Sequence, residues 1–248
     1  MMELFTYGLI AFVSVILSGA LLLVVTIPRN SMRLLLAFSG AFLFAISMLH
    51  LIPELYASQA KNIGMWILTG FLIQLLLEYL SEGIEHGHIH MHGKDDEHLH
   101  HLGAKIPFGV VIGLCLHSFL EGMPLGMVTS DSKIFPPFLM GIVLHNIPIA
   151  IAFMGLLLHL GHSKTKAFSL LGMFALMTPF GMLASHFIGM QLQGDLAPYF
   201  SAVTGVVIGI FLHISTTILF ESTENHRFNA LKFVTILLGV AAAWLLIR

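Results

Sequence analysis

The sequence predicts an all-α integral membrane protein, a bundle of eight transmembrane helices. Of its 248 residues, 57% are hydrophobic and only 10% are charged, whereas about a quarter of an average soluble domain is charged. The apolar residues form long runs, and a helix needs about 20 such residues to cross the hydrocarbon core. The runs lack the alternation of barrel strands. We therefore expect residues 1–248 to form a single transmembrane domain, with no separate soluble domain.

The eight helices are the apolar runs between charged or Pro- and Gly-rich breaks. The first run is expected to be a membrane span and not a cleaved signal peptide. It lacks the basic region that begins a signal peptide, and it is longer than the apolar region of one. The second ends in HLIPE at His50–Glu54, and the third ends on Glu78 and Glu82, which we expect at an exposed helix terminus. The expected bounds are 4–27, 34–52, 65–82, 107–129, 136–160, 168–189, 198–220 and 229–247.

The orientation follows from the Lys and Arg residues of the loops, which gather on the cytoplasmic side of a membrane. With the N-terminus outside, the inner loops hold eight of these residues and the outer segments three. The inner ones are Arg29, Arg33, Lys94, Lys105, Lys164, Lys166, Arg227 and Lys232, and the outer ones are Lys61, Lys133 and Arg248. Both termini are therefore expected outside, in a plasma or bacterial inner membrane.

A His-rich loop, residues 83–106, follows the third helix and is expected in the cytoplasm. Imidazole ligands suit zinc, copper, nickel and iron, and dense His tracts bind such ions. The loop is either a segment that captures, buffers or senses metal, or a solvated polar linker. Its histidines are His86, His88, His90, His92, His98, His100 and His101.

The fourth helix carries an ionisable pair, His117 and Glu121, near its centre. An ionisable group at this depth costs about 2.5–3.5 kcal/mol on insertion scales, so the pair is a functional hypothesis. The i, i+4 spacing puts both side chains on one helical face, where they can reach a single cation. The alternative is a purely structural hydrogen bond between them. Gly122 and Gly126 have a G-x-x-x-G spacing that favours close helix packing.

The fifth helix supplies His145 and Asn146 at a similar depth, followed by Pro148. An interior proline removes the hydrogen bond to the carbonyl four residues back, so Pro148 frees the carbonyl of Leu144. Pro124 is expected to act in the same way in the fourth helix. Each helix would then present side-chain ligands and a loose carbonyl near one level; alternatively, both prolines kink the helices for packing alone.

Other polar residues suggest an entrance and an exit for a metal ion. His50 and Glu54 lie at the outer end of the second helix, where they form either an entrance site or an interfacial anchor. His213 lies deep in the seventh helix, and Glu221 and His226 lie at its inner end. These three residues are candidates for an exit site.

These motifs resemble those of the ZIP (Zrt-, Irt-like) family of metal transporters, of the bacterial type. HSFLEG in the fourth helix is similar to the family motif H-N-x-P-E-G, and HNIPIA in the fifth is similar to H-x-x-P-E-G. The likeness extends to the eight spans, the His-rich third loop, HLIPE and a TPFG turn in the sixth helix. It implies a zinc, iron or manganese importer with its site between the fourth and fifth helices. That site would include His117, Ser118, Glu121, His145 and Asn146.

The sequence departs from the family pattern where further ligands would stand. Ser118 replaces the usual Asn, Leu120 replaces Pro, Ile149 stands where Glu or His is usual, and Thr178 precedes Pro179 where many relatives have Glu. The missing carboxylates belong chiefly to the second, more oxygen-rich metal position. A largely single-metal site follows as a hypothesis.

The function that these residues favour is transport of a divalent metal cation, zinc before iron or manganese, into the cytoplasm. Zinc is favoured because imidazole content is high. Two alternatives stay: an intramembrane zinc hydrolase, against which the absence of an H-E-x-x-H motif counts, and a metal sensor that does not transport. An enzyme is not expected. Cys115 is the only cysteine, which excludes a disulfide. The expected partners are metal ions and the lipid bilayer, not nucleic acid, and a homodimer is left open.

Overall fold

The protein is a bundle of transmembrane helices. The computed structural model describes residues 2–81, 108–127, 135–192, 196–221 and 230–248. Over these residues, eight helices are long and apolar enough to cross a membrane, which confirms the expected fold class. The helices are α1 (Met2–Leu21), α2 (Arg29–Ile46), α3 (Ile52–Ala57), α4 (Ile63–Ser81), α6 (Phe108–Gly122), α7 (Phe135–His159), α8 (Lys164–Gln191), α9 (Ala197–Glu221) and α10 (Ala230–Ile247).

Two of the spans combine helix types. The second runs from α2 through a π-helix, η1 (Ser47–Leu51), into α3. In η1 the amide of Ile52 donates to the carbonyl of Ser47, directly before Pro53, which has no amide hydrogen to donate. The fourth span ends in a 3-10 helix, η3 (Met123–Gly126). Such departures from the α-helix often mark functional positions.

The expected helix bounds need corrections, the largest at the first, second and fourth helices. The second span, expected over 34–52, runs over Arg29–Ala57. The first helix was expected to reach residue 27, but α1 ends at Leu21. Pro28 explains part of this, because it is extended (ψ 146°) and disfavours helical geometry in the residue before it. The fourth helix was expected to run to residue 129 with Pro124 in its interior. Instead the α-helix stops at Gly122, and Pro124 lies in η3, so it ends the α-helix rather than kinking it.

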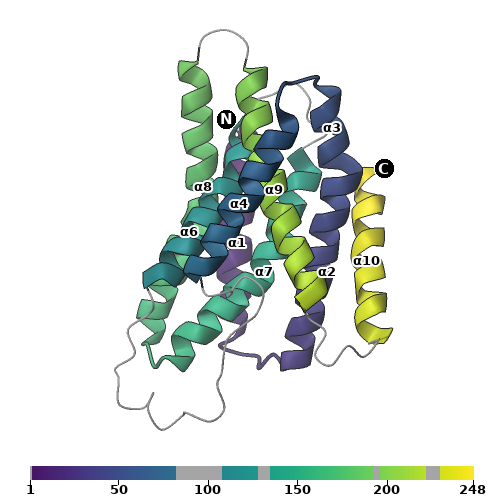
Figure 1. The fold of residues 1–248 in the computed structure, drawn as a ribbon. Helices are drawn as coiled ribbons and strands as arrows, with labels where there is room; N and C mark the ends of the chain where they lie inside the picture. Colours follow the sequence, from purple (N-terminus) through teal and green to yellow (C-terminus); the bar gives the residue numbers. More distant parts are fainter. Residues whose placement is uncertain (1, 82–107, 128–134, 193–195, 222–229) are drawn as a thin grey trace.

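The helices pack in two groups. In one group, α9 packs against both α4 and α2, and α10 packs against α2. In the other, α8 packs against α6, α1 and α7, and α1 packs against α7. The groups meet where α6 contacts α4 and α7 contacts α2. Both chain ends lie at the same end of the bundle (Figure 1), as an even number of spans requires. The carboxyl end of α4 lies at the opposite end of the bundle.

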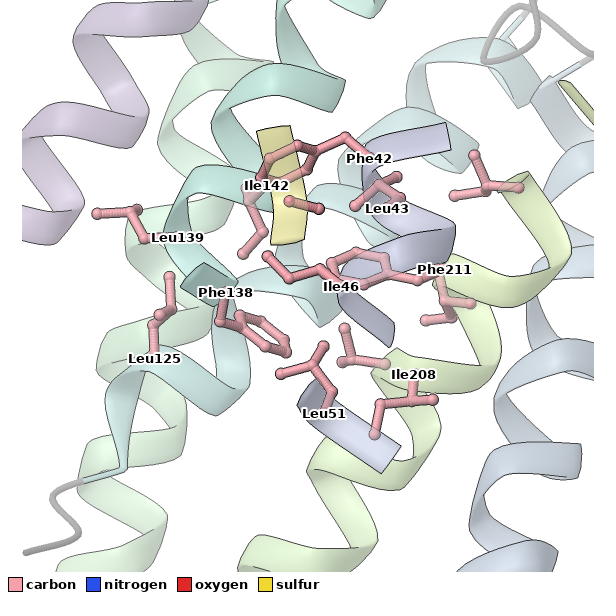
Figure 2. Close-up of a cluster of buried hydrophobic side chains, with 14 of the residues drawn as sticks. Phe42, Leu43, Ile46, Leu51, Leu125, Phe138, Leu139, Ile142, Ile208 and Phe211 are labelled. Carbon is pink, nitrogen blue, oxygen red and sulfur yellow. The ribbon is translucent and has the colours of Figure 1, made fainter. Parts of the chain in front are cut away.

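A cluster of buried apolar side chains joins the two groups (Figure 2). The part of the cluster that is labelled in Figure 2 will be called the apolar plug, and it comprises Phe42, Leu43, Ile46, Leu51, Leu125, Phe138, Leu139, Ile142, Ile208 and Phe211. They come from α2 and η1, η3, α7 and α9. The rings of Phe138 and Phe211 lie 5.4 Å apart across the boundary between the groups.

The helix register places polar residues next to the apolar plug. On α7, Phe138, Ile142 and His145 recur at the four- and three-residue steps of one helical face. On α6, Glu121 precedes the plug residue Leu125 by one turn. The polar residues thus lie directly beneath the plug, on the side away from the chain ends. Beyond them a second apolar cluster, which includes Leu114 and Ile149, packs α1, α6, α7 and α8 together.

Candidate metal centre

His117, Glu121 and His145 meet in the centre of the bundle. One potential ligand atom of each lies within 4.8 Å of the others, and this is the one such group of His, Cys, Asp and Glu side chains in the part of the chain that the structure describes. Nε2 of His117 lies 3.0 Å from Oε1 of Glu121. The ring of His145 stands almost perpendicular to that of His117, with 5.8 Å between their centroids. All three side chains are 0% exposed.

Close packing of α6 against α8 holds the first two of these residues. A Cβ atom on Gly122 would overlap the carbonyl of Thr178, and one on Gly181 would overlap the carbonyl of Phe119. Only glycine allows the two backbones to lie so near. The hydroxyls of Ser118 and Thr178 lie 2.8 Å apart and bond the same two helices together. The close approach expected at Gly122 is confirmed.

Helix α7 brings His145 and Asn146 to the same place. Pro148 lies inside the helix, so the carbonyl of Leu144, beside His145, loses its usual partner. Asn146 is 1% exposed, and neither Oδ1 nor Nδ2 has a hydrogen-bond partner among the described residues. A buried amide without partners costs free energy. Such an amide is available to a ligand.

Gln74 is a neighbour of the centre that the sequence did not reveal. It lies in α4, is 0% exposed, and its Oε1 is 3.1 Å from Nδ1 of His117. The only signal in the sequence is a single amide in the middle of an apolar helix, ILTGFLIQLLLEYL. Nothing in the local pattern shows that this amide faces a histidine 43 residues later.

Ile149 and Thr178 stand at positions where the family pattern has ligands, and both are buried and uncharged. Ile149 is 0% exposed and belongs to the second apolar cluster, and Thr178 is bonded to Ser118. Glu121 is therefore the only carboxylate among the residues of the centre. A dication held here would be partly neutralised by one charge, and imidazole and amide groups would complete the coordination.

The donor set fits a zinc ion. Zinc binds imidazole nitrogen and carboxylate oxygen at about 2.0–2.2 Å, commonly with three protein ligands and one open position. Two such ligands of one ion lie at most about 4.4 Å apart, and the atoms here lie within 4.8 Å. A small inward movement of the side chains would close the site around the ion.

The two residues expected at the entrance, His50 and Glu54, differ in solvent exposure. His50 lies in the π-helix η1 and is buried, with 8% exposed, and its Nε2 has no hydrogen-bond partner within the described part of the chain. Glu54 lies in α3 and is exposed. His50 therefore lies in the interior of the bundle, whereas Glu54 lies at its surface.

His213 has a partner that was not expected. Its Nδ1 lies 3.4 Å from Oε2 of Glu78, across the contact between α9 and α4, and the two side chains are 6% and 23% exposed. The ring of Phe71 contacts the imidazole edge to face, with 4.7 Å between centroids. The expectation that Glu78 is an exposed helix terminus is wrong, because α9 covers it. Glu78 follows Gln74 by one turn of α4, toward the end of the bundle away from the chain termini.

The remaining candidate ligands fall outside the described residues. They are the side chain of Glu221, His226 and the loop histidines His86, His88, His90, His92, His98, His100 and His101.

Comparison with known proteins agrees with these features. The family model described as ZIP Zinc transporter matches residues 81–247. The protein zntD of Dictyostelium discoideum is 27% identical over 175 residues, which cover 66% of this chain and 25% of that protein. Zinc transporter ZIP9-B of Xenopus laevis is 28% identical over 161 residues, which cover 62% of this chain and 50% of that one.

Zinc transporter ZIP9 of Micropogonias undulatus is 27% identical over 161 residues, 62% of this chain and 49% of its own length. The chain thus spans half or less of the length of these curated relatives. The family model covers about two thirds of the chain, and its members are transporters rather than enzymes. With its eight apolar helices, the protein is an integral membrane protein and belongs to the ZIP zinc transporter family.

Proposed function

We propose that the protein carries a divalent metal ion, zinc in the first place, across the bilayer, and that His117, Glu121 and His145 hold the ion on its way. The observation that carries the proposal is the meeting of three fully buried ligand-type side chains from two spans. Burying such groups in a membrane costs free energy, so their presence at this depth indicates a function. Two imidazoles and one carboxylate favour zinc over manganese, which prefers oxygen ligands. Iron stays a competitor to be tested.

One ion occupies the centre at a time in this proposal. Glu121 is the single carboxylate there, and Ile149 and Thr178 offer nothing that would neutralise a second dication. The remaining coordination position of the ion is filled either by the amide oxygen of Asn146 or by water. Ser118, bonded to Thr178, lies at the edge of the site as an additional oxygen donor.

The route through the protein follows from the neighbours of the centre. The apolar plug separates the centre from the end of the bundle that holds both termini, which we propose to face the outside. On the other side of the centre, α4 and α9 provide polar side chains along the route, namely Gln74, Glu78 and His213. This arrangement is what a state closed to the outside requires in alternating access.

The ends of this route are the entrance and exit residues. His50 and Glu54 would receive the ion outside, once the plug opens. Glu78 and His213, followed by Glu221 and His226, would pass it to the cytoplasm, so the protein imports metal. The His-rich loop, residues 83–106, would collect the released ion within a single transporter domain, 1–248.

The membrane in this proposal is the plasma membrane, or the inner membrane of a bacterium. A homodimer stays a prediction, because lipid covers the exposed apolar faces of α1 and α10 equally well. Native mass spectrometry of the protein in nanodiscs measures the number of chains directly.

Uptake of radioactive zinc into proteoliposomes tests the function. Wild type should accumulate zinc, and His117→Ala should abolish uptake. His186→Ala is a matched control, since His186 lies in α8, outside the centre, and contacts the Phe187 ring; this variant should transport normally. Absence of uptake by wild type, or equal loss in both variants, would reject the proposal. Competition by iron or manganese in the same assay ranks the ions.

A further inference from the structure

We propose that Gln74 is a positioning residue for the metal: its side-chain amide holds the His117 imidazole so that Nε2 faces the ion. This inference rests on the proposed function and names a residue that neither the family motifs nor the ligand cluster contains. The carbonyl Oε1 of Gln74 lies 3.1 Å from Nδ1 of His117, and Nε2 on the other side of the ring lies 3.0 Å from Glu121. The imidazole is thus held between an amide and a carboxylate.

The chemistry of imidazole explains why a partner is needed at Nδ1. A neutral imidazole has one N–H donor and one bare nitrogen, and either nitrogen can carry the proton. To bind a metal through Nε2, His117 must carry its proton on Nδ1. Oε1 of Gln74 accepts that proton in a hydrogen bond and so selects this tautomer. Metal-binding histidines in general donate their other N–H to such a partner, which also fixes the plane of the ring.

A glutamine suits this position better than other acceptors. It is neutral, so it leaves the charge balance of Glu121 and a dication unchanged, whereas a carboxylate would add a negative charge in a fully buried site. With Oε1 facing Nδ1, the amide supports only the tautomer that leaves Nε2 free for the metal.

The amide comes from a rigid neighbouring helix. A Cβ atom on Gly70, one turn before Gln74, would overlap the carbonyl of Val206, so α4 lies in direct backbone contact with α9. His117 is fixed from the other side, because α6 packs tightly against α8. The bond between Gln74 and His117 therefore joins the two helix groups at the ligand itself, and rotation of the ring would break this bond.

Packing alone would give a different result on substitution. If Gln74 merely filled space between α4 and α6, Gln74→Met, which has a similar shape and no hydrogen bond, would bind zinc as wild type does. If it positions His117, Gln74→Met loses the bond, whereas Gln74→Glu keeps an acceptor at the same place. Ser81→Ala is the matched control: Ser81 is a buried polar residue of the same helix, bonded to the carbonyl of Glu78 and not to the centre.

The experiment measures zinc uptake by the full chain in proteoliposomes as a function of zinc concentration. We expect Gln74→Met to raise KM by about tenfold or more, the effect of losing an outer partner of a metal ligand, with a much smaller change in Vmax. Gln74→Glu should bring KM back to within a few-fold of wild type, and Ser81→Ala should leave it unchanged. Rescue by Glu, at equal thermal stability, is a result that packing does not produce.

Two outcomes overturn the inference. One is a KM of Gln74→Met that equals that of wild type, and the other is a Gln74→Glu variant as impaired as Gln74→Met. If Gln74→Met does not fold, Gln74→Asn replaces it, because its amide is withdrawn by one methylene and should raise KM in the same way. Failure of the proposed function is separate, since then wild type takes up no zinc or His117→Ala transports normally.

Discussion

Among the described residues, a histidine lies beside a glutamate in two places inside the bundle, and the two pairs differ in separation, in burial and in the presence of a third potential ligand. His117 and Glu121 lie on one helix, 3.0 Å apart, fully buried, with His145 as a third potential ligand. His213 and Glu78 join two helices and lie 3.4 Å apart; His213 is buried, but the Glu78 side chain is 23% exposed. A carrier needs one site that strips water from the ion and a later one that lets it go. The first pair fits binding and the second fits release.

Glu121→Gln should have the largest effect, because it removes the only carboxylate of the centre while keeping its shape. Losing one partner of a buried charge pair costs about 3–5 kcal/mol, so zinc uptake should fall on the order of 100-fold or more. The measurement is initial uptake into proteoliposomes, with Glu3→Gln as the control for loss of a charge, since Glu3 is exposed in the first turn of α1. Uptake by Glu121→Gln within a few-fold of wild type would remove the distinction between the two pairs.

Substitution of His145 tests whether the third ligand is what separates the centre from the release pair. His145→Ala should reduce zinc uptake by at least about tenfold, since losing even an outer partner of a ligand has that effect. His145→Cys should restore transport and shift preference toward cadmium, because thiolate is a soft ligand. Competition between zinc and cadmium measures the shift. A His145→Ala variant that transports zinc normally would show that two ligands suffice.

Acid should weaken uptake, because protonated imidazole cannot bind a metal. Uptake measured with pH equal on both sides should therefore fall as the pH is lowered. The centre, with two imidazoles, should respond more steeply than a site with one. Uptake that instead rises as the external pH falls would indicate proton-driven transport and contradict this prediction.

The smallest effect is expected at the release pair. Glu78→Gln or His213→Ala leaves the centre intact, so KM for zinc should change little and Vmax by about threefold, in line with the modest coupling of a partly exposed pair. Concentration-dependent uptake separates the two quantities. A large rise in KM in either variant would place the pair among the binding residues and contradict its role in release.

Much of the fold was predictable because a membrane leaves few choices. The hydrocarbon core demands about 20 apolar residues per span and internal pairing of every backbone group, and the spans confirm that reasoning. Errors occurred where local backbone chemistry decided the outcome. Pro124 ends the α-helix in favour of η3, and the π-helix η1 precedes Pro53.

The centre was predictable in part. His117 and Glu121 are one turn apart on the same helix, so their proximity follows from helix geometry alone. His145 was expected nearby because it lies at a similar depth in the next span. Gln74, by contrast, was missed, and Glu78 was expected to be exposed, since both depend on which helices pack against α4.

The sequence by itself determined the class of protein, the number of spans and the central His and Glu pair, because hydropathy and helical periodicity act over short stretches of chain. Only the tertiary structure decided which distant residues face that pair. Close packing through glycines sets the distance and rotation of α4, α6, α8 and α9, and these placed Gln74 against His117 and Glu78 against His213. Contacts between helices far apart in the chain depend on the shapes of all the surfaces between them, which no local pattern records.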